Sequence, residues 1–403
     1  MKNPISLFFA AVIFVFIPVF AARPMTSLFA EELNASMYEI GLITACYSIT
    51  PLVMAIFAGR YIDRYGERIP LFIGSLGILI SLSLPFIFPV IPSLYLSQIL
   101  LGASQLLAIL SIQNGVNKSA SNQNRDRAVG TFSFFSSIGM LLGPVFGGYA
   151  TEHFGFRQSF LLLALVPLVS LFISLFVPTS KRTMNQSKQK FTIGFKELLL
   201  IPSLSRTILV SMVILSALDI FYVYFPLFAQ SLGFRPSQIG WLLAAQSLGN
   251  TLSRFFMPKL VEHYGRITIL WVFMGIGALA YGSIPFMQQF VLLFCTALIL
   301  GAGLGVTQPL TIILAFNASP HGMTGEVLGI RLASNRLAQT IIPFFFASLS
   351  NVIGLGPIFF LKAFLLIIGA LTAKRMTDPS EKQKSENKKL DLSERNITEK
   401  PHL

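Results

Sequence analysis

Ionisable side chains inside long apolar stretches are the residues of this chain that could do chemistry. Asp219, Arg23, Arg331 and Arg336 all lie in such stretches. Because a charge is costly in hydrocarbon, groups placed there mark ion and proton pathways. Asp219 lies about a dozen residues into its stretch, close to the middle of a bilayer at roughly 1.5 Å per helical residue. We expect Asp219 to take up and release a proton beside Arg23 or Arg336; the alternative is a static ion pair that only ties helices together.

The composition excludes a water-soluble globule. Hydrophobic residues make up 54% of the 403-residue chain, charged residues only 12%, and the mean hydropathy is +0.70, whereas soluble domains are about 25% charged. Lysine and arginine number 30 against 17 acidic residues, but no basic patch with interleaved aromatic residues points to nucleic acid. Cys46 and Cys295 both lie in apolar stretches, so neither a disulfide framework nor a metal site is indicated.

The sequence shows no pattern typical of an enzyme. No glycine-rich phosphate loop ending in Gly-Lys occurs, which argues against ATP hydrolysis. A gradient must then supply the work. The four histidines fall in predicted loops or in the C-terminal tail: His153, His263, His321 and His402.

Apolar stretches of about 20 residues, the length of a helix that spans a bilayer, recur along the chain. Twelve such stretches can be delimited, which predicts an all-α membrane protein with twelve transmembrane helices. They lie near residues 5–29, 38–58, 70–90, 94–116, 128–150, 158–178, 206–229, 238–257, 267–287, 290–315, 326–349 and 356–374.

Basic residues are distributed unequally between the two sets of predicted loops. The loops that we assign to the outside carry little more than Arg157 and Arg235. Positive residues favour the cytoplasmic side of a membrane, so we expect both termini in the cytoplasm and a multi-pass protein of the cell membrane. The basic residues of the predicted cytoplasmic loops are Arg60, Arg64, Arg68, Lys118, Arg125, Arg127, Lys181, Arg182, Lys188, Lys190, Lys196, Lys259 and Arg266.

The two halves of the chain repeat each other. Several glycines and a proline recur at a constant separation, for example Gly102 and Gly301, where 301 − 102 = 199. A constant offset across five predicted helices indicates a duplicated six-helix unit. The other pairs are Gly41 with Gly240, Gly66 with Gly265, Gly130 with Gly329, Pro144 with Pro343 and Gly155 with Gly354.

This repeat divides the chain into four parts. Residues 1–178 and 206–374 are expected to form two six-helix bundles. Residues 179–205 are expected to form a cytoplasmic linker, either with a short amphipathic segment on the membrane surface or as a plain connector. Residues 375–403 have too little apolar content to fold, so we expect a disordered cytoplasmic tail.

A charged turn separates the second and third apolar stretches. Residues 59–71 read Gly-Arg-Tyr-Ile-Asp-Arg-Tyr-Gly-Glu-Arg-Ile-Pro-Leu. The spacing resembles motif A of the major facilitator superfamily more than a generic positively charged hairpin. The resemblance implies two pseudo-symmetric six-helix bundles, a substrate site between them, and a latch in which Asp63 contacts the start of the eleventh helix, with Arg331 as our expected partner. The other latch residues are Gly59, Arg64, Gly66 and Arg68.

A second motif lies on the fifth predicted helix. Residues 139–148 read Gly-Met-Leu-Leu-Gly-Pro-Val-Phe-Gly-Gly, which resembles motif C, a pattern that in this superfamily marks proton-coupled antiporters, chiefly drug and metabolite exporters. The shared face of Gly139, Gly143 and Gly147 lets another helix approach closely, and Pro144 bends the helix. With Gly148, these residues are expected to form a hinge or seal between the halves; an ordinary glycine packing face is the alternative.

Polar residues at helical spacing predict a wet cavity. On the fourth helix, Gln98 stands where the superfamily's motif B has an arginine, and Gln98, Gln105 and Gln113 fall on one face. Amides facing lipid without partners would cost several kcal/mol, so we expect them to line a cavity, with packing between helices as the alternative. The other cavity candidates are Tyr222, Gln246, Asn250, Asn335 and Gln339.

Together these features predict a secondary transporter. We expect a proton-coupled antiporter that works as a monomer without cofactor or metal. It would export a small lipophilic or drug-like molecule by alternating access, with the proton gradient as energy source. A proton-coupled symporter that imports a metabolite shares the fold, and motif C argues against it. A transporter-like sensor is a further alternative, but the chain offers no sizeable soluble domain.

Overall fold

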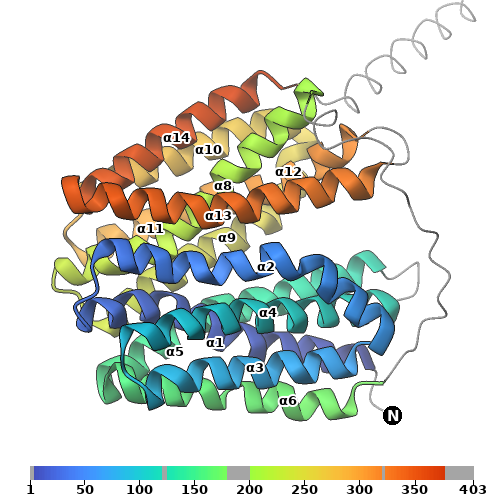
Figure 1. Cartoon of the computed structure of the whole chain (residues 1–403). Helices are drawn as coiled ribbons and strands as arrows, with labels where there is room; N and C mark the ends of the chain where they lie inside the picture. Colours follow the sequence, from blue (N-terminus) through green and yellow to red (C-terminus); the bar gives the residue numbers. More distant parts are fainter. Residues whose placement is uncertain (1–3, 120–124, 179–199, 320–322, 377–403) are drawn as a thin grey trace, which may run out of the picture.

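The computed structural model describes residues 4–119, 125–178, 200–319 and 323–376 (Figure 1). Most of the predicted linker and nearly all of the predicted tail therefore lie outside the described residues. The regular elements of the described ranges are all helices. The first half contains α1 (Pro4–Glu32), α2 (Met37–Tyr65), α3 (Arg68–Ile87), α4 (Ile91–Ser119), α5 (Arg125–Leu165) and α6 (Pro167–Phe176). The second half contains α8 (Pro202–Ser231), α9 (Pro236–Tyr264), α10 (Arg266–Ser283), the 3₁₀ helix η2 (Ile284–Phe286), α11 (Phe290–Gly305), α12 (Thr307–Asn317), α13 (Thr324–Ile353) and α14 (Gly356–Lys374).

These helices make up the twelve predicted membrane spans. Within the described ranges, nine helical stretches are long and apolar enough to cross a membrane. One of them, Arg127–Phe176, holds two spans, because Gly155 interrupts the helical backbone with φ 76°. The other two spans are α9 and α13, which fall outside the nine and carry several of the polar residues predicted to line the cavity. The all-α fold with twelve spans is confirmed.

The backbone at the connections repeats as the sequence does. Six described residues have a positive φ, and all six form pairs with the predicted offset, as in 233 − 34 = 199. Such a backbone conformation is uncommon for residues other than glycine, so its recurrence at matched positions is a geometric property of the repeat. The pairs are Asn34 with Gly233, Gly66 with Gly265, and Gly155 with Gly354.

The two halves pack mainly through two equivalent pairs of helices, α2 with α13 and α5 with α9, and α1 also contacts α8. In Figure 1 the first-half helices fill the lower part of the molecule and the second-half helices the upper part. A Cβ on Gly41 of α2 would lie 3.3 Å from the carbonyl oxygen of Pro343 on α13. A Cβ on Gly240 of α9 would lie 2.4 Å from the carbonyl oxygen of Pro144 on α5. These are the same contact made twice, because both the glycines and the prolines are repeat partners.

The glycine motif on α5 serves both neighbours of that helix. Gly139 and Gly143 face α1, where an added Cβ would lie 3.2 Å and 2.7 Å from the carbonyl oxygens of Ile13 and Ile17. Gly147 also faces α1. Gly148 faces the other half instead, because its Cβ would lie 2.4 Å from the carbonyl oxygen of Pro236 on α9. The motif therefore packs α5 within its own half and against the opposite half.

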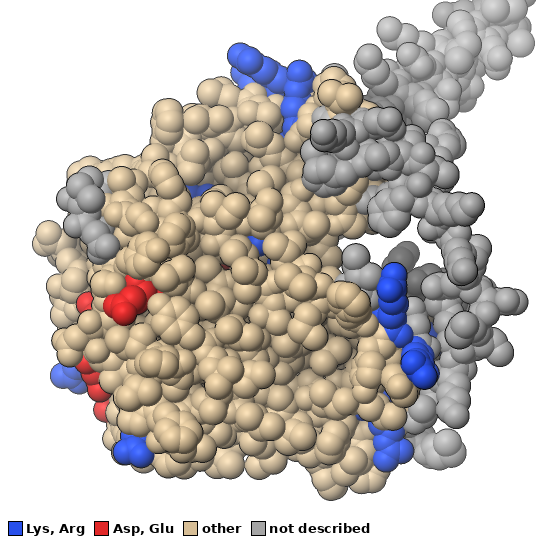
Figure 2. Space-filling view, viewed as in Figure 1, with Lys and Arg blue, Asp and Glu red and all other residues tan. Residues whose placement is uncertain are grey.

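The halves are in contact at one end of the molecule and apart at the other. We call the end that holds residues 33–36 and 232–235 the tight end, since Gly41 and Gly240 lie beside it. Gly59, Gly130 and Gly329 lie toward the opposite, open ends of α2, α5 and α13, and an added Cβ there would meet nothing within 4 Å. Figure 1 shows α2 and α13 diverging toward this open end, and Figure 2 shows a notch between the halves there.

The surface is consistent with a protein surrounded by lipid. In Figure 2 the charged side chains gather near the two ends, and the broad face between them is almost entirely uncharged. Within a bilayer every backbone N–H and C=O must find its partner inside the protein, which long helices achieve. The start of α2 is capped: the backbone N–H of Glu39 donates to the Ser36 hydroxyl, and the Glu39 carboxylate accepts from the Ser36 N–H.

Gly240→Ala should open the tight end. The added methyl group would lie 2.4 Å from a backbone carbonyl oxygen, and overpacking of this kind costs about 1–3 kcal/mol. In a background with both native cysteines replaced by serine, a cysteine at the buried position Thr151 should react faster with a membrane-impermeant maleimide, by about fivefold or more.

Gly130→Ala is the matched control for this experiment. It adds the same methyl group to one of the helices that join the halves, where nothing lies within 4 Å, so labelling at position 151 should not change. Equal labelling rates for the Gly240→Ala and Gly130→Ala variants would contradict the packing argument.

Candidate transport site

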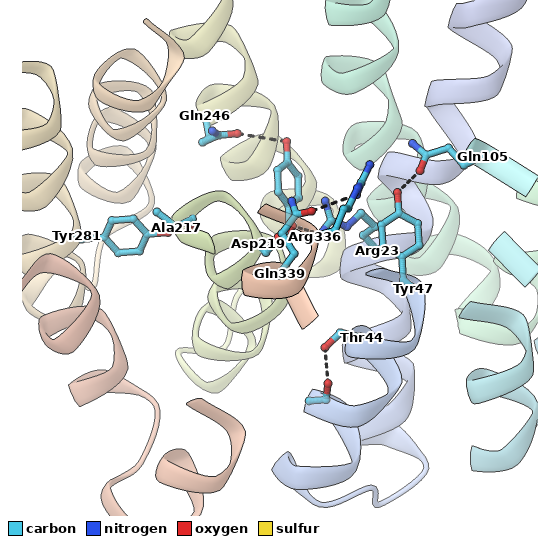
Figure 3. Close-up of polar contacts among 12 residues, drawn as sticks. Arg23, Thr44, Tyr47, Gln105, Ala217, Asp219, Gln246, Tyr281, Arg336 and Gln339 are labelled. Carbon is cyan, nitrogen blue, oxygen red and sulfur yellow. Dashed lines mark hydrogen bonds and ion pairs between the residues drawn. The ribbon is translucent and has the colours of Figure 1, made fainter. Parts of the chain in front are cut away.

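A buried ion pair links the two halves at the middle of the molecule. Arg23 on α1 donates from Nη2 to Oδ1 of Asp219 on α8 (Figure 3). The two side chains are only 14% and 4% exposed. A buried pair of this kind must satisfy both charges, because either one alone would be strongly unfavourable. The sequence suggested Arg23 or Arg336 as the neighbour of Asp219, and in the structure Arg23 forms the ion pair with it.

Two tyrosine rings enclose the Arg23 guanidinium group. Its central carbon lies 5.1 Å from the centre of the Tyr47 ring and 5.4 Å from that of Tyr222. Such distances are typical of cation–π contacts, which help to stabilise a desolvated cation. Each hydroxyl is held in turn by a glutamine: Tyr47 donates to Gln105 of α4, and Tyr222 donates to Gln246 of α9 at 3.2 Å. The ion pair is therefore positioned by side chains from both halves.

The repeat places equivalent positions of both halves in this one site. Three positions on the first and second helices of each half recur there, with different residues in the two copies. The duplication therefore accounts for the equivalent positions, and sequence divergence accounts for the charges at them. One half contributes the cation and the other the carboxylate. The equivalent pairs are Phe20 with Asp219, Arg23 with Tyr222, and Tyr47 with Gln246.

Arg336 adds a second cation from α13. Its Nη1 donates to Oε1 of Gln339 at 3.1 Å, and both side chains are half-buried. Figure 3 shows Arg336 next to Arg23 and Asp219, and its charge acts on Tyr47 across the junction of the halves. Within the described part of the chain no carboxylate forms an ion pair with Arg336.

Several buried polar atoms around this centre have no hydrogen-bond partner. They include Oδ2 of Asp219, Nε2 of Gln246, and both side-chain polar atoms of Asn335. Asn335 is 1% exposed and precedes Arg336 on α13. Most buried polar groups in proteins are paired, so this group of unpaired atoms marks a place where a polar ligand or proton could be accommodated.

Some predicted cavity residues have other surroundings. The Gln98 amide donates to the Thr26 hydroxyl at 2.9 Å and ties α4 to α1, which is the packing alternative raised for it. Gln113 is exposed two turns beyond Gln105, toward the open end. Asn250 is buried where α9 packs against α11. Of the predicted glutamine face on α4, therefore, only Gln105 contacts the ion-pair centre through a described hydrogen bond.

The predicted latch is only partly described. Arg331 is buried, and its Nη2 donates to the Thr311 hydroxyl on α12 at 2.8 Å. The Asp63 side chain lies outside the described residues, so its contact with Arg331 stays a prediction. Within the same turn, Glu67 is buried and accepts from Nζ of Lys118 at 2.6 Å and from Nδ2 of Asn114 at 2.9 Å. These bonds fix the turn to α4 of its own half.

Sequence reasoning missed Lys362. This lysine lies near the middle of α14, is 0% exposed, and donates from Nζ to the Ser216 hydroxyl of α8 at 2.6 Å. Ser216 precedes Asp219 by three residues, so both lie on one face of the helix. The sequence does contain the signal that would have identified this residue, because Lys362 lies inside a predicted span, as Arg336 does. Among the charges inside predicted spans the sequence pointed only to Asp219 and three arginines, and Lys362 adds to that set.

The fold and this centre define a class of protein. Two repeated six-helix halves that meet at a buried polar site midway along their helices are the architecture of a secondary transporter. The chain belongs to the Major Facilitator Superfamily, whose family description matches it over residues 7–330 and again over residues 207–401. This is a family of transporters and not of enzymes.

Known proteins similar to the chain are transporters, at low identity. It is 23% identical to Multidrug resistance protein 1 of Bacillus subtilis (strain 168) over 353 residues, which cover 83% of this chain and 90% of the relative. It is 25% identical to Multidrug resistance protein MdtG of Dickeya zeae (strain Ech586), with 86% and 88% covered. A crystal structure of the nucleoside transporter NupG superposes with a TM-score of 0.79 at 12% identity, covering 92% of this chain and 98% of that one.

Asp219→Asn should destabilise the protein more than the double variant Asp219→Asn/Arg23→Gln. The single change leaves Arg23 buried without a carboxylate, which costs about 3–5 kcal/mol, whereas the double change removes both charges. Thermal unfolding of purified protein in detergent should give the lowest melting temperature for the single variant.

The exposed pair Arg235 and Glu152 serves as the control for this comparison. Its nitrogen and oxygen atoms are 3.7 Å apart, and the Arg235 side chain is 75% exposed. Arg235→Gln and Arg235→Gln/Glu152→Gln should both melt close to the wild type, because water screens such a pair. A double variant at residues 23 and 219 that melts below Asp219→Asn would refute the predicted coupling.

Proposed function

We propose that this protein is a proton-coupled antiporter that exports a small lipophilic or drug-like molecule. The observation that carries the proposal is the buried Arg23–Asp219 pair, a titratable carboxylate placed where the two halves meet. The multidrug resistance proteins among its relatives and the glycine-proline motif on α5 support export. The aromatic side chains Phe20, Tyr47 and Tyr222 surround the pair, and side chains of this kind suit a lipophilic molecule.

Protonation of Asp219 would change which orientation of the halves is favoured. In the ionised form its carboxylate attracts Arg23 across the junction and holds α1 close to α8. Protonation removes this attraction, so the arrangement that depends on it loses stability relative to the alternative. A cargo that binds when the proton leaves then travels in the opposite direction to the proton. This is alternating access driven by the proton gradient, without a cofactor.

We place the open end on the cytoplasmic side of the cell membrane. That end holds the start of α1 and the basic residues Arg60, Arg64, Arg68 and Lys118. The positive-inside rule then puts both termini in the cytoplasm. Cargo would enter from the cytoplasm and leave past the tight end after the halves rock. Because one chain contains both sides of the ion pair, a monomer is a complete functional unit.

We also propose that the charged turn at residues 59–68 is a latch for the opposite orientation. In the outward-open form Asp63 would contact Arg331, which here donates to Thr311. The halves are apart at the open end in this structure, as they would be with the latch released. The bonds of Glu67 to Lys118 and Asn114 would hold the turn in place on its own half.

Proton and solute movements separate this proposal from its alternatives. In proteoliposomes loaded with a pH-sensitive dye, antiport couples solute entry to proton efflux. A symporter moves solute and proton in the same direction. A sensor without transport activity gives no flux. A panel of lipophilic dyes and small metabolites, each tested in both gradient directions, therefore distinguishes the three functions.

Asp219→Asn should abolish transport driven by a pH gradient. Asparagine keeps the size of the side chain but cannot exchange a proton, so the coupled rate should fall by about 100-fold or more, to the background of empty liposomes. Asp219→Glu, which keeps the carboxyl group, should retain measurable transport. Full pH-driven transport by Asp219→Asn would end the role of Asp219 as the proton carrier.

Asp63→Asn should shift the protein toward the form that is open at the cytoplasmic end. The substitution removes the charge from the proposed Asp63–Arg331 contact and leaves the Arg331–Thr311 bond intact. Loss of a contact worth about 1–2 kcal/mol changes the populations by roughly 5- to 30-fold. Crosslinking between cysteines at Gly130 and Gly329 reports closure of that end and should decrease. An unchanged crosslinking yield would contradict the latch.

A further inference from the structure

The buried lysine on α14 has no role in the mechanism described so far. Lys362 is completely buried, and its ammonium group donates to the Ser216 hydroxyl. Within the described residues none of the ion pairs includes Lys362. A buried ammonium without a carboxylate is costly, particularly in a membrane, so its position calls for a compensating interaction.

The closest candidate for this interaction is Asp219. Ser216, the hydrogen-bond acceptor of Lys362, precedes Asp219 by one turn on the same face of α8. Asp219 uses Oδ1 to accept from Arg23, whereas its Oδ2 has no hydrogen-bond partner. One carboxylate oxygen is therefore available on the side chain that Lys362 would have to reach.

We propose that Lys362 is a second, same-half counter-charge for Asp219, which takes over when Arg23 withdraws. Arg23 belongs to the first half, so rocking of the halves changes its distance from Asp219. Lys362 and Asp219 both belong to the second half, and their helices α14 and α8 pack together. The lysine therefore stays within reach in either orientation. Its four-carbon stem is flexible enough to move the ammonium by one helical turn, from Ser216 toward Asp219.

This arrangement makes Lys362 a positioning residue for the coupling proton. When Arg23 has moved away, an ammonium beside Asp219 would stabilise the carboxylate and promote release of its proton. Without Lys362 the carboxylate would have no cation beside it once Arg23 has moved away. The inference concerns the same site as the proposed antiport and rests on it for its role in transport, but the protonation of Asp219 can be measured without transport.

The other charged and titratable groups near this pair come from five helices. Arg23 of α1 and Arg336 of α13 approach Asp219 from the junction of the halves. On the opposite side, the hydroxyl of Tyr281 of α10 donates to the carbonyl oxygen of Ala217. The remaining two are Tyr47 of α2 and Tyr222 of α8, whose rings lie against Arg23.

The test is an infrared pH titration of the Asp219 carboxyl group in purified full-length protein. Asp219→Asn identifies the band by its loss. Arg23→Gln mimics the withdrawn arginine, and in this background Lys362→Met should raise the midpoint of protonation by about 1–3 pH units, the usual effect of one nearby charge. In the presence of Arg23 the same substitution should shift the midpoint less, because the carboxylate still has a cationic partner.

Three further variants separate this role from simple packing. Lys374→Met removes another lysine of α14, one that lies 5.4 Å from the Trp271 ring, and should leave the midpoint unchanged. Lys362→Arg keeps a cation and should largely preserve the midpoint. Ser216→Ala removes the alternative acceptor and frees the ammonium for Asp219, so it should lower the midpoint. If Lys362 only packed against its neighbours, Lys362→Met and Ser216→Ala would not shift the midpoint in opposite directions.

The outcomes distinguish this inference from the proposed function. Coincident midpoints for Arg23→Gln with and without Lys362→Met would overturn the role of Lys362, whatever the transport assays show. If Lys362→Met does not fold, the comparison uses Ser216→Ala instead. Equal midpoints for Arg23→Gln and Arg23→Gln/Ser216→Ala would also overturn the role of Lys362. Absence of proton-coupled transport in the wild type, together with the predicted shifts, would reject the antiport and leave the Lys362–Asp219 interaction standing.

Discussion

The structure depends on the cost of placing charge at the centre of a membrane protein. Arg23 and Asp219 are tolerated there because each neutralises the other and two tyrosine rings cover the guanidinium group. The partners come from different halves, so the pair is complete only when the halves are correctly placed. A static protein would gain little from this arrangement compared with apolar packing. In the antiport mechanism that we propose, it would make the relative position of the halves sensitive to a proton.

The contacts at the tight end give this sensitivity a mechanical counterpart. Gly240 on α9 lies against the carbonyl oxygen of Pro144 on α5, and Gly41 on α2 lies against Ala347 and the carbonyl oxygen of Pro343 on α13. The two contacts are related by the repeat, so the junction contains the same kind of close contact twice. Close packing resists gradual deformation, which favours a small number of discrete arrangements over a continuous range. Motif C thus contributes to the junction by backbone proximity instead of by charge.

The sequence was sufficient for the fold and for part of the site. Hydropathy and the 199-residue offset predicted the spans and the repeat, because both follow from composition and from glycines that the backbone needs. The hydrogen-bond partners of side chains were harder to predict. Gln98 and Gln105 share a helix face, yet Gln98 bonds to Thr26 of α1 and Gln105 to Tyr47 of α2. Whether such a side chain ties two helices together or belongs to the transport site depends on the positions of the neighbouring helices. Lys362 was missed although its position in a span is visible in the sequence.

The placement of Asp219 between two kinds of partner has a functional logic. A single cross-half partner would leave the carboxylate unpaired after each rocking motion, and a lone charge in the membrane would then pull the halves back. A single same-half partner would stay with Asp219 in both orientations, and protonation would not distinguish them. Arg23 of the first half bonds to Asp219 in this structure, and Lys362 of the second half lies one helical turn away on Ser216. In the mechanism that we propose, the carboxylate would have a cation in both states but a different one in each, and this difference would allow a proton to bias the orientation.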